Sequence, residues 1–198
     1  LFIDLHMVAG SGQLLRTGQA SGPRTRNGHL SNAHSRELLA ELKHANLRQL
    51  PLSESKDLIR RCLDVFSKEL KNFDRTNAIY NFAYNASTPD LEAWLPTQVR
   101  AFRTGGGAIN PLPHKGRVKL TCTSFGPGNC EQAIDREIEK LLARESGWLI
   151  FNTHGLDDEG WGPIRATYLD RLLDRLSAIE SVDILPAGRA IEKYVDPT

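Results

Sequence analysis

Gly147-Trp148-Leu149-Ile150-Phe151-Asn152-Thr153-His154-Gly155 is the stretch that decides the fold. Five of its first seven residues are apolar or β-branched, and the run then ends in a polar histidine followed by glycine. A short apolar run bounded by turn-forming residues is typical of a strand buried inside a parallel sheet. The stretch therefore predicts a central strand that carries His154 at its C-terminal end, which is where the sites of α/β folds gather.

Strand and helix patterns alternate along the rest of the chain. Further strands are predicted over residues 1–8, 77–85, 118–123 and 183–185. Helices are predicted over residues 53–70, 91–95, 131–144, 167–179 and 187–194, with Ser53 and Thr167 as expected N-caps. This alternation favours a parallel sheet, closed or nearly so, in a single domain that spans residues 1–198.

Composition excludes several classes of protein. The formal net charge is +1, and the chain contains no block of five or six like charges, so no nucleic-acid or polybasic membrane surface is indicated. No apolar run approaches the roughly 20 residues of a membrane span. Cys62, Cys122 and Cys130 match no metal knuckle, and free buried thiols are favoured over a disulfide between Cys122 and Cys130.

Histidines mark a second informative region. Residues 28–35 read Gly-His-Leu-Ser-Asn-Ala-His-Ser and contain His34, and residues 44–50 read His-Ala-Asn-Leu-Arg-Gln-Leu and begin with His44. Imidazole is a common zinc ligand. On one continuous helix His34 and His44 would lie about 15 Å apart, too far to share a metal. Two alternatives remain open: the segment between them loops out, or the two histidines form no common site.

Taken together, these stretches resemble the polysaccharide deacetylases, carbohydrate esterase family four. Residues 28–35 resemble the G-H-E-I-G-x-H-[ST] motif, and residues 44–50 resemble the H-P-N-L-x-x-L run that follows it. Residues 82–84 resemble the F-A-Y segment. The strand that ends in His154, its acidic loop and the helix and strand after them resemble the last unit of the family's fold. The resemblance implies a distorted (β/α) barrel.

The same resemblance implies a function. It implies a metal-dependent hydrolase that removes acetyl groups from a carbohydrate, as an N- or O-deacetylase. His34 and His44 would be ligands of a divalent metal, expected to be zinc, His154 the general acid, and Tyr84 a residue beside the oxyanion. The acidic turn at residues 157–159 would form a wall of the groove.

The chain lacks one motif of the family, which leaves alternative interpretations of its function and of Tyr84 open. It contains no T-F-D-D-G, the strand that holds the family's base and metal aspartate, so the barrel is expected to be incomplete at its N-terminus and a leader or first strand is expected upstream of Leu1. A catalytically silent module that binds a glycan or a protein is the alternative function. A tyrosine packed in the core is the competing interpretation of Tyr84. The glycan, the oligomeric state and the location, cytoplasmic or exported, are not indicated.

Overall fold

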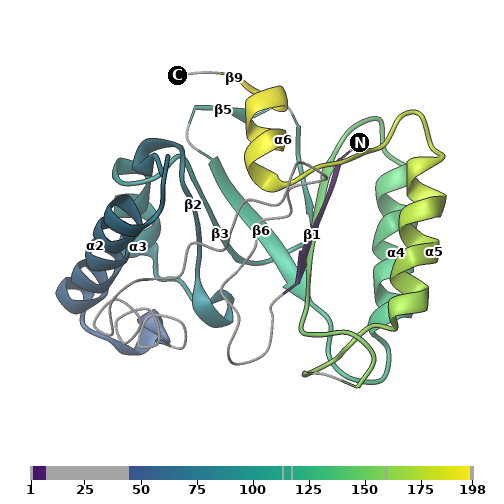
Figure 1. Cartoon of the computed structure of the whole chain (residues 1–198), viewed down its shortest axis with the longest axis horizontal. Helices are drawn as coiled ribbons and strands as arrows, with labels where there is room; N and C mark the ends of the chain where they lie inside the picture. The colour runs from purple at the N-terminus through teal and green to yellow at the C-terminus, as the bar shows by residue number, and fades with distance from the viewer. Residues whose placement is uncertain (1, 8–44, 113, 117, 159, 197–198) are drawn as a thin grey trace. The chain divides into compact units, whose positions relative to one another are not determined.

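A computed structural model describes residues 2–7, 45–112, 114–116, 118–158 and 160–196 (Figure 1). These residues divide into two compact units. Unit 1 contains the strand at residues 2–7 together with residues 106–116 and 121–196, and unit 2 contains residues 45–105 and 118–120. The expectation of a single domain stays a prediction.

Strand β7 (Trp148–Thr153) lies inside the sheet of unit 1, and all six of its residues are buried. β1 (Phe2–Met7) runs parallel to it over its whole length, and β8 (Asp183–Ile184) runs parallel to β1. Along the other edge of β7, β4 (Ile109–Asn110) pairs antiparallel with its start and β6 (Val118–Ser124) pairs parallel with its end. Strands that are buried on both faces of a parallel sheet have continuous apolar sequences, as β7 does.

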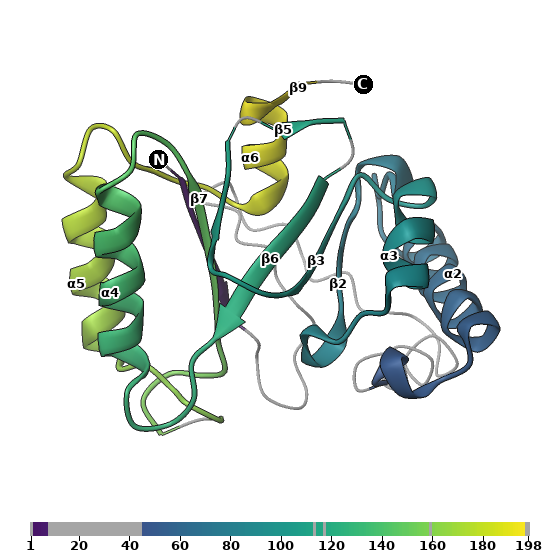
Figure 2. The same cartoon turned by 180° about the vertical axis from the view of Figure 1, so that it is seen from behind.

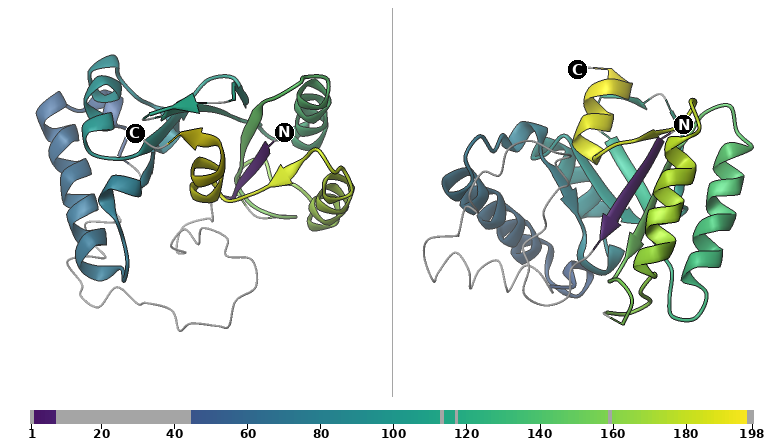
Figure 3. Two further views of the ribbon diagram at one scale, coloured as in Figure 1. Left: turned by 90° about the horizontal axis from the view of Figure 1, so that it is seen from above. Right: turned by 45° about the vertical axis from the view of Figure 1, so that its right-hand side comes forward.

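Two helices cover one face of this sheet: α4 (Cys130–Leu142) and α5 (Ala166–Ser177). They lie side by side in Figures 1 and 2, and the left view of Figure 3 shows them end-on. Because side chains alternate along a strand, Leu149 and Phe151 of β7 share one face and join the core under the helices. The helices contribute the apolar stripe of Ile134, Ile138, Leu141, Tyr168, Leu172 and Leu176.

The last helix of unit 1 is α6 (Ala187–Tyr194), which is followed by β9 (Val195–Asp196). β9 pairs parallel with β5 (His114–Lys115) in a two-stranded sheet. Tyr194 and Lys193 both donate hydrogen bonds to the Asp183 carboxylate, which ties α6 back to β8.

Unit 2 has its own core. Helices α2 (Leu52–Glu69) and α3 (Pro89–Trp94) pack beside the parallel pair β2 (Ile79–Asn81) and β3 (Ala101–Gly105). Short 3-10 turns connect them: η1 (Leu47–Gln49), η2 (Arg75–Asn77), η3 (Ala83–Asn85) and η4 (Leu95–Thr97). The buried core residues of this unit are Leu47, Leu58, Ile59, Leu63, Phe82, Leu91, Leu95, Val99 and Phe102.

The predicted mixture of helices with a mostly parallel sheet is confirmed. The described strands form an open sheet, since among them β2 pairs only with β3 and β8 only with β1. The two expected N-caps are wrong: α2 begins after Pro51 and α5 after Arg165. The three cysteines are buried free thiols, as predicted. No helix in the described part of the chain has the length and apolar content that crossing a bilayer requires.

One buried amide joins β4, β6 and β7 where they meet in unit 1. The Asn110 side chain accepts a hydrogen bond from Thr121 N at 2.8 Å and donates to Thr121 O at 2.8 Å and Trp148 O at 3.3 Å. Asn110 thus takes the place of a backbone peptide at the point where β4 gives way to β6. Only 4% of this residue is exposed, so its partners would find no water if the amide were removed.

Replacing this amide should destabilise unit 1. We expect Asn110→Ala to lower the free energy of unfolding by about 2–4 kcal/mol, because several buried backbone groups lose their partner. Asn129→Ala is the matched control, since the exposed Asn129 side chain makes no capping hydrogen bond and its loss should cost no more than about 0.5 kcal/mol. Chemical denaturation measures both. Equal losses in the two variants would contradict the bridging role of Asn110.

Candidate functional site

His154 stands directly after β7, as the sequence predicts. The neighbouring strands end at the same edge, because Ser124 of β6 pairs with Asn152 and Met7 of β1 pairs with Thr153 in parallel register. The carboxyl ends of parallel strands form the edge at which α/β folds place their sites. This edge of unit 1 is therefore the candidate site.

Three consecutive residues at this edge bury polar atoms whose hydrogen-bonding capacity is unused. Among the described residues, Asn152 Oδ1, Thr153 Oγ1 and His154 Nδ1 have no hydrogen-bond partner. Thr153 is fully buried and Asn152 is 5% exposed. Most buried polar atoms in native proteins are paired, so these three atoms are exceptions at the strand end. Because side chains alternate along a strand, Thr153 faces the opposite side of the sheet from Asn152, and of the three residues only His154 is partly exposed.

The His154 ring is half-buried and packs against one aromatic residue. Its ring centroid lies 5.3 Å from that of Trp161, with the planes at 86°, which is an edge-to-face contact. Burial lowers the pKa of His154 below its ordinary value, because desolvation disfavours the charged imidazolium. The neutral imidazole is therefore the form present at pH 7.

A closed loop carries Trp161 back to His154. Its base is pinned by a bridge between Leu156 and Ile164, with Asp157 N donating to Ile164 O at 2.9 Å. Near its tip, Gly160 lies so close to the strand end that an added Cβ would stand 1.8 Å from His154 O. Gly160 has a φ of +82°, which side-chain-bearing residues rarely adopt. The loop backbone therefore packs directly on the end of β7.

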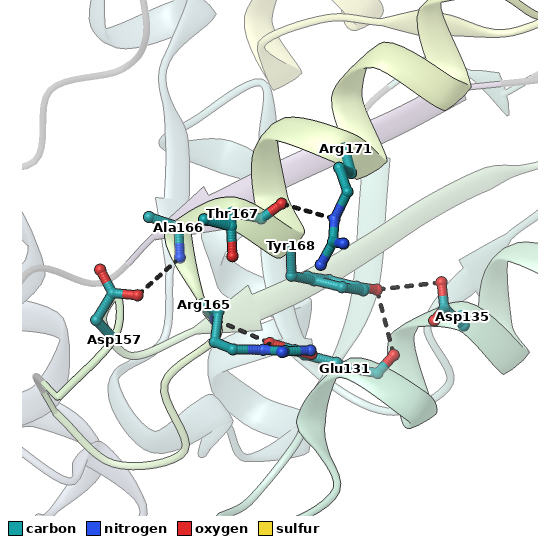
Figure 4. Close-up of polar contacts among 8 residues, drawn as sticks. All are labelled: Glu131, Asp135, Asp157, Arg165, Ala166, Thr167, Tyr168 and Arg171. Carbon is teal, nitrogen blue, oxygen red and sulfur yellow. Dashed lines mark hydrogen bonds and ion pairs between the residues drawn. The ribbon is translucent and has the colours of Figure 1, made fainter.

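Both ends of the loop are fastened to helices, Asp157 to α5 and Arg165 to α4, as Figure 4 shows. Asp157 Oδ1 accepts from Ala166 N at 3.0 Å and so caps α5 from nine residues upstream. The Arg165 guanidinium holds the Glu131 carboxylate through Nε at 3.0 Å and Nη2 at 2.5 Å, and this contact lowers the pKa of Glu131. Tyr168 Oη lies 3.2 Å from Asp135 Oδ1 and 3.2 Å from Glu131 O. One residue of the acidic turn that was expected to form a groove wall, Asp157, therefore caps helix α5.

Tyr84 lies in unit 2, so it and His154 are described separately. Its side chain is 67% exposed, so the competing interpretation of a core tyrosine is wrong. Its backbone is left-handed, with φ 55° and ψ 17°, and Asn85 follows with φ 52°. Two consecutive non-glycine residues in this conformation are uncommon and are found where the surrounding structure imposes them, often at functional sites.

Side chains of unit 2 hold this left-handed turn in place. Thr104 Oγ1 donates to Asn85 O at 3.2 Å and lies 2.5 Å from Ser87 Oγ. Ser87 Oγ donates to Glu92 Oε1 at 2.5 Å, and Lys119 Nζ binds Glu92 Oε2 at 2.6 Å. A continuous polar chain therefore runs from a charged pair to the carbonyl beside Tyr84.

The two expected metal ligands, His34 and His44, lie outside the described residues. Within the described ranges, no three His, Cys, Asp or Glu side chains come together as a metal site. Both expected ligands fall outside these ranges, so the metal stays a prediction.

Comparison with models of known protein families, with curated proteins and with solved structures found no match to this chain. The resemblance to polysaccharide deacetylases therefore rests on the sequence motifs, and the site rests on its own geometry.

Sequence reasoning assigned no role to Trp161 or to the polar pair Asn152 and Thr153. The signal for Trp161 was present, since an aromatic residue stands between Gly160 and Gly162 shortly after a strand-end histidine. Asn152 and Thr153 give no such signal, because polar residues are common near strand ends. Their burial is what makes them unusual, and the sequence does not show it.

The loop packing leads to a first test at the site. We expect Gly160→Ala to lower the free energy of unfolding by about 2 kcal/mol or more, because the new methyl group meets His154 O and the left-handed backbone disfavours alanine. Gly188→Ala is the control: its Cβ meets nothing within 4 Å, so a change below about 1 kcal/mol is expected. Thermal denaturation compares them, and a neutral Gly160→Ala would show that the loop does not pack on β7.

The burial of His154 leads to a second test. An NMR titration of its ring protons should give a pKa below about 6.5, the ordinary value for histidine. At a pH between the pKa of His154 in the folded chain and its higher pKa in the unfolded chain, the unfolded chain binds more protons. The free energy of unfolding therefore decreases as the pH falls through this range. Wild type should therefore lose more stability than His154→Gln from pH 7.5 to 5.5. A His154 pKa above 6.5 would refute the assigned environment.

Proposed function

We propose that this protein is a metal-dependent hydrolase that removes acetyl groups from a carbohydrate. The bond it hydrolyses is the amide bond of an N-acetylated sugar. One observation carries the proposal: half-buried His154 stands at the carboxyl edge of a parallel sheet, in contact with the exposed aromatic ring of Trp161. An ionisable group with a shifted pKa at such an edge is a suitable proton-transfer residue.

In this proposal His154 is the general acid that protonates the leaving nitrogen. Water attacks the acetyl carbonyl carbon, the C–N bond breaks, and acetate and a free amine leave. Because burial keeps the imidazole neutral at pH 7, it must take up a proton before it donates one, and the attacking water releases one. Its lowered pKa then makes the imidazolium a readier donor.

Further parts of the proposal rest on the sequence resemblance. His34 and His44 would hold the metal, most suitably zinc, which when bound polarises the attacking water and the acetyl oxygen. Tyr84 would stand beside that oxygen, and its imposed left-handed backbone agrees with a functional turn. The sheet would belong to a distorted (β/α) barrel.

A catalytically silent glycan-binding module is the second candidate. The exposed Trp161 favours it, because an aromatic face beside a polar edge binds a sugar without any bond being broken. The two functions differ in one observable, the release of acetate.

An acetate assay on N-acetylated chitooligosaccharides tests the enzyme. Wild type should release acetate, and His154→Ala and His154→Gln should each lower kcat by about 10²–10⁴-fold, since both remove the proton donor. His154→Gln keeps most of the side-chain volume and so separates proton transfer from packing. Glu145→Gln, an exposed carboxylate before the opposite end of β7, should retain full activity.

A chelator should abolish acetate release, zinc should restore it, and His34→Ala should prevent the restoration. Acetate release that survives in His154→Gln would exclude His154 as the acid. Binding of the oligosaccharide by wild type without any acetate, with zinc present, would favour the silent module.

A further inference from the structure

Trp161 is a large apolar side chain that the fold holds in solvent, with 55% of the residue exposed. The other tryptophan of unit 1, Trp148, is fully buried in the core. Core packing therefore accounts for Trp148 and leaves Trp161 unexplained. An exposed indole carries an unfavourable contact with water, which a ligand covering it would remove.

The backbone around Trp161 is constrained. Gly160 and Gly162 flank it with φ values of +82° and +67°. An added Cβ would stand 1.8 Å from His154 O at Gly160 and 2.7 Å from Phe125 O at Gly162. Both glycines thus allow the loop backbone to lie against the ends of β6 and β7.

Two contacts of the Trp161 ring are defined. Its six-membered ring lies close to Gly126, where an added Cβ would stand 3.1 Å from Cζ2, and its contact with His154 is edge-to-face. A side chain at position 126 would displace the indole. The arrangement presents an aromatic surface next to the imidazole, with Asp158 of the same loop exposed as a hydrogen-bond acceptor.

These features match the chemistry of a sugar ring. A pyranose has a face of C–H groups that stacks on an aromatic ring and a rim of hydroxyl groups that hydrogen-bond to carboxylates and amides. A single flat ring beside a polar edge suits such a ligand.

We propose that Trp161 is the stacking platform for the pyranose ring whose acetamido group is presented to His154. The inference rests on the proposed function for its reaction, but it concerns binding and can be tested without turnover. It names Trp161 as the residue that recognises the saccharide, and it assigns Gly126, Gly160 and Gly162 the role of seating that ring.

Tryptophan fluorescence with tetra-N-acetylchitotetraose as the probe tests the platform. Binding to wild type should change the emission, and Trp161→Phe should lose most of that change while keeping affinity within a few-fold, because a flat ring remains. Trp161→Ala should weaken binding by at least about tenfold, measured by calorimetry. Trp161→Leu, which keeps apolar bulk without an aromatic face, should weaken binding to a similar extent.

Trp94→Phe is the matched control. Trp94 is partly exposed in unit 2, but Lys56 Nζ and Arg60 Cζ already lie 5.5 Å and 5.1 Å from its ring centroid. Its replacement should leave affinity and the fluorescence response to the saccharide largely intact. A melting temperature of each Trp161 variant close to that of wild type shows that lost affinity is not lost folding.

The outcomes separate this inference from the proposed function. If wild type releases acetate and Trp161→Ala has an unchanged KM, the platform is refuted and the enzyme stands. If wild type binds the saccharide through Trp161 but releases no acetate, the platform stands and the enzyme is refuted. No binding of the saccharide by wild type, or equal binding by the alanine, leucine and phenylalanine variants, overturns the platform.

Discussion

The burial of β7 between strands on both of its edges and helices on one face is the constraint on which unit 1 depends. All six residues of the strand are buried, and β1 runs along its whole length. A strand so enclosed must satisfy every backbone group within the sheet, and the buried amide of Asn110 completes the pairing where β4 gives way to β6. The position of His154 follows, because it is the first residue beyond this enclosed strand.

The loop after His154 turns a strand end into a site. Two left-handed glycines bring its backbone against the ends of β6 and β7, and Asp157 and Arg165 fasten its two ends to α5 and α4. The half-buried imidazole and the exposed indole of Trp161 thereby lie in edge-to-face contact. Loops carry function when a rigid scaffold positions them, and here the scaffold is the helix pair above β7.

The proposed chemistry depends on the contact between His154 and Trp161. A neutral, partly desolvated imidazole is poised for proton transfer, and a flat aromatic ring beside it is suited to a sugar. The silent module and the enzyme share the same binding surface and differ only in whether a polarised water is supplied. The left-handed turn at Tyr84, held by the chain from Lys119 to Thr104, is a second feature in which local strain suggests function.

Sequence by itself determined the main helices, the central strand and the place of His154, whereas the short strands β4, β5 and β9 were not predicted. Periodicity is a local property, so residues 148–153 read as a buried strand and residues 187–194 as a helix before any packing was known. The free cysteines were predicted from their spacing, which matches no metal knuckle. Tertiary structure alone decided which distant groups meet. Asp157 caps α5 in place of Thr167, Asn110 bridges two strands, Tyr84 faces solvent, and Trp161 lies beside His154. Each of these depends on contacts between residues several to many positions apart, and such contacts leave no period in the sequence.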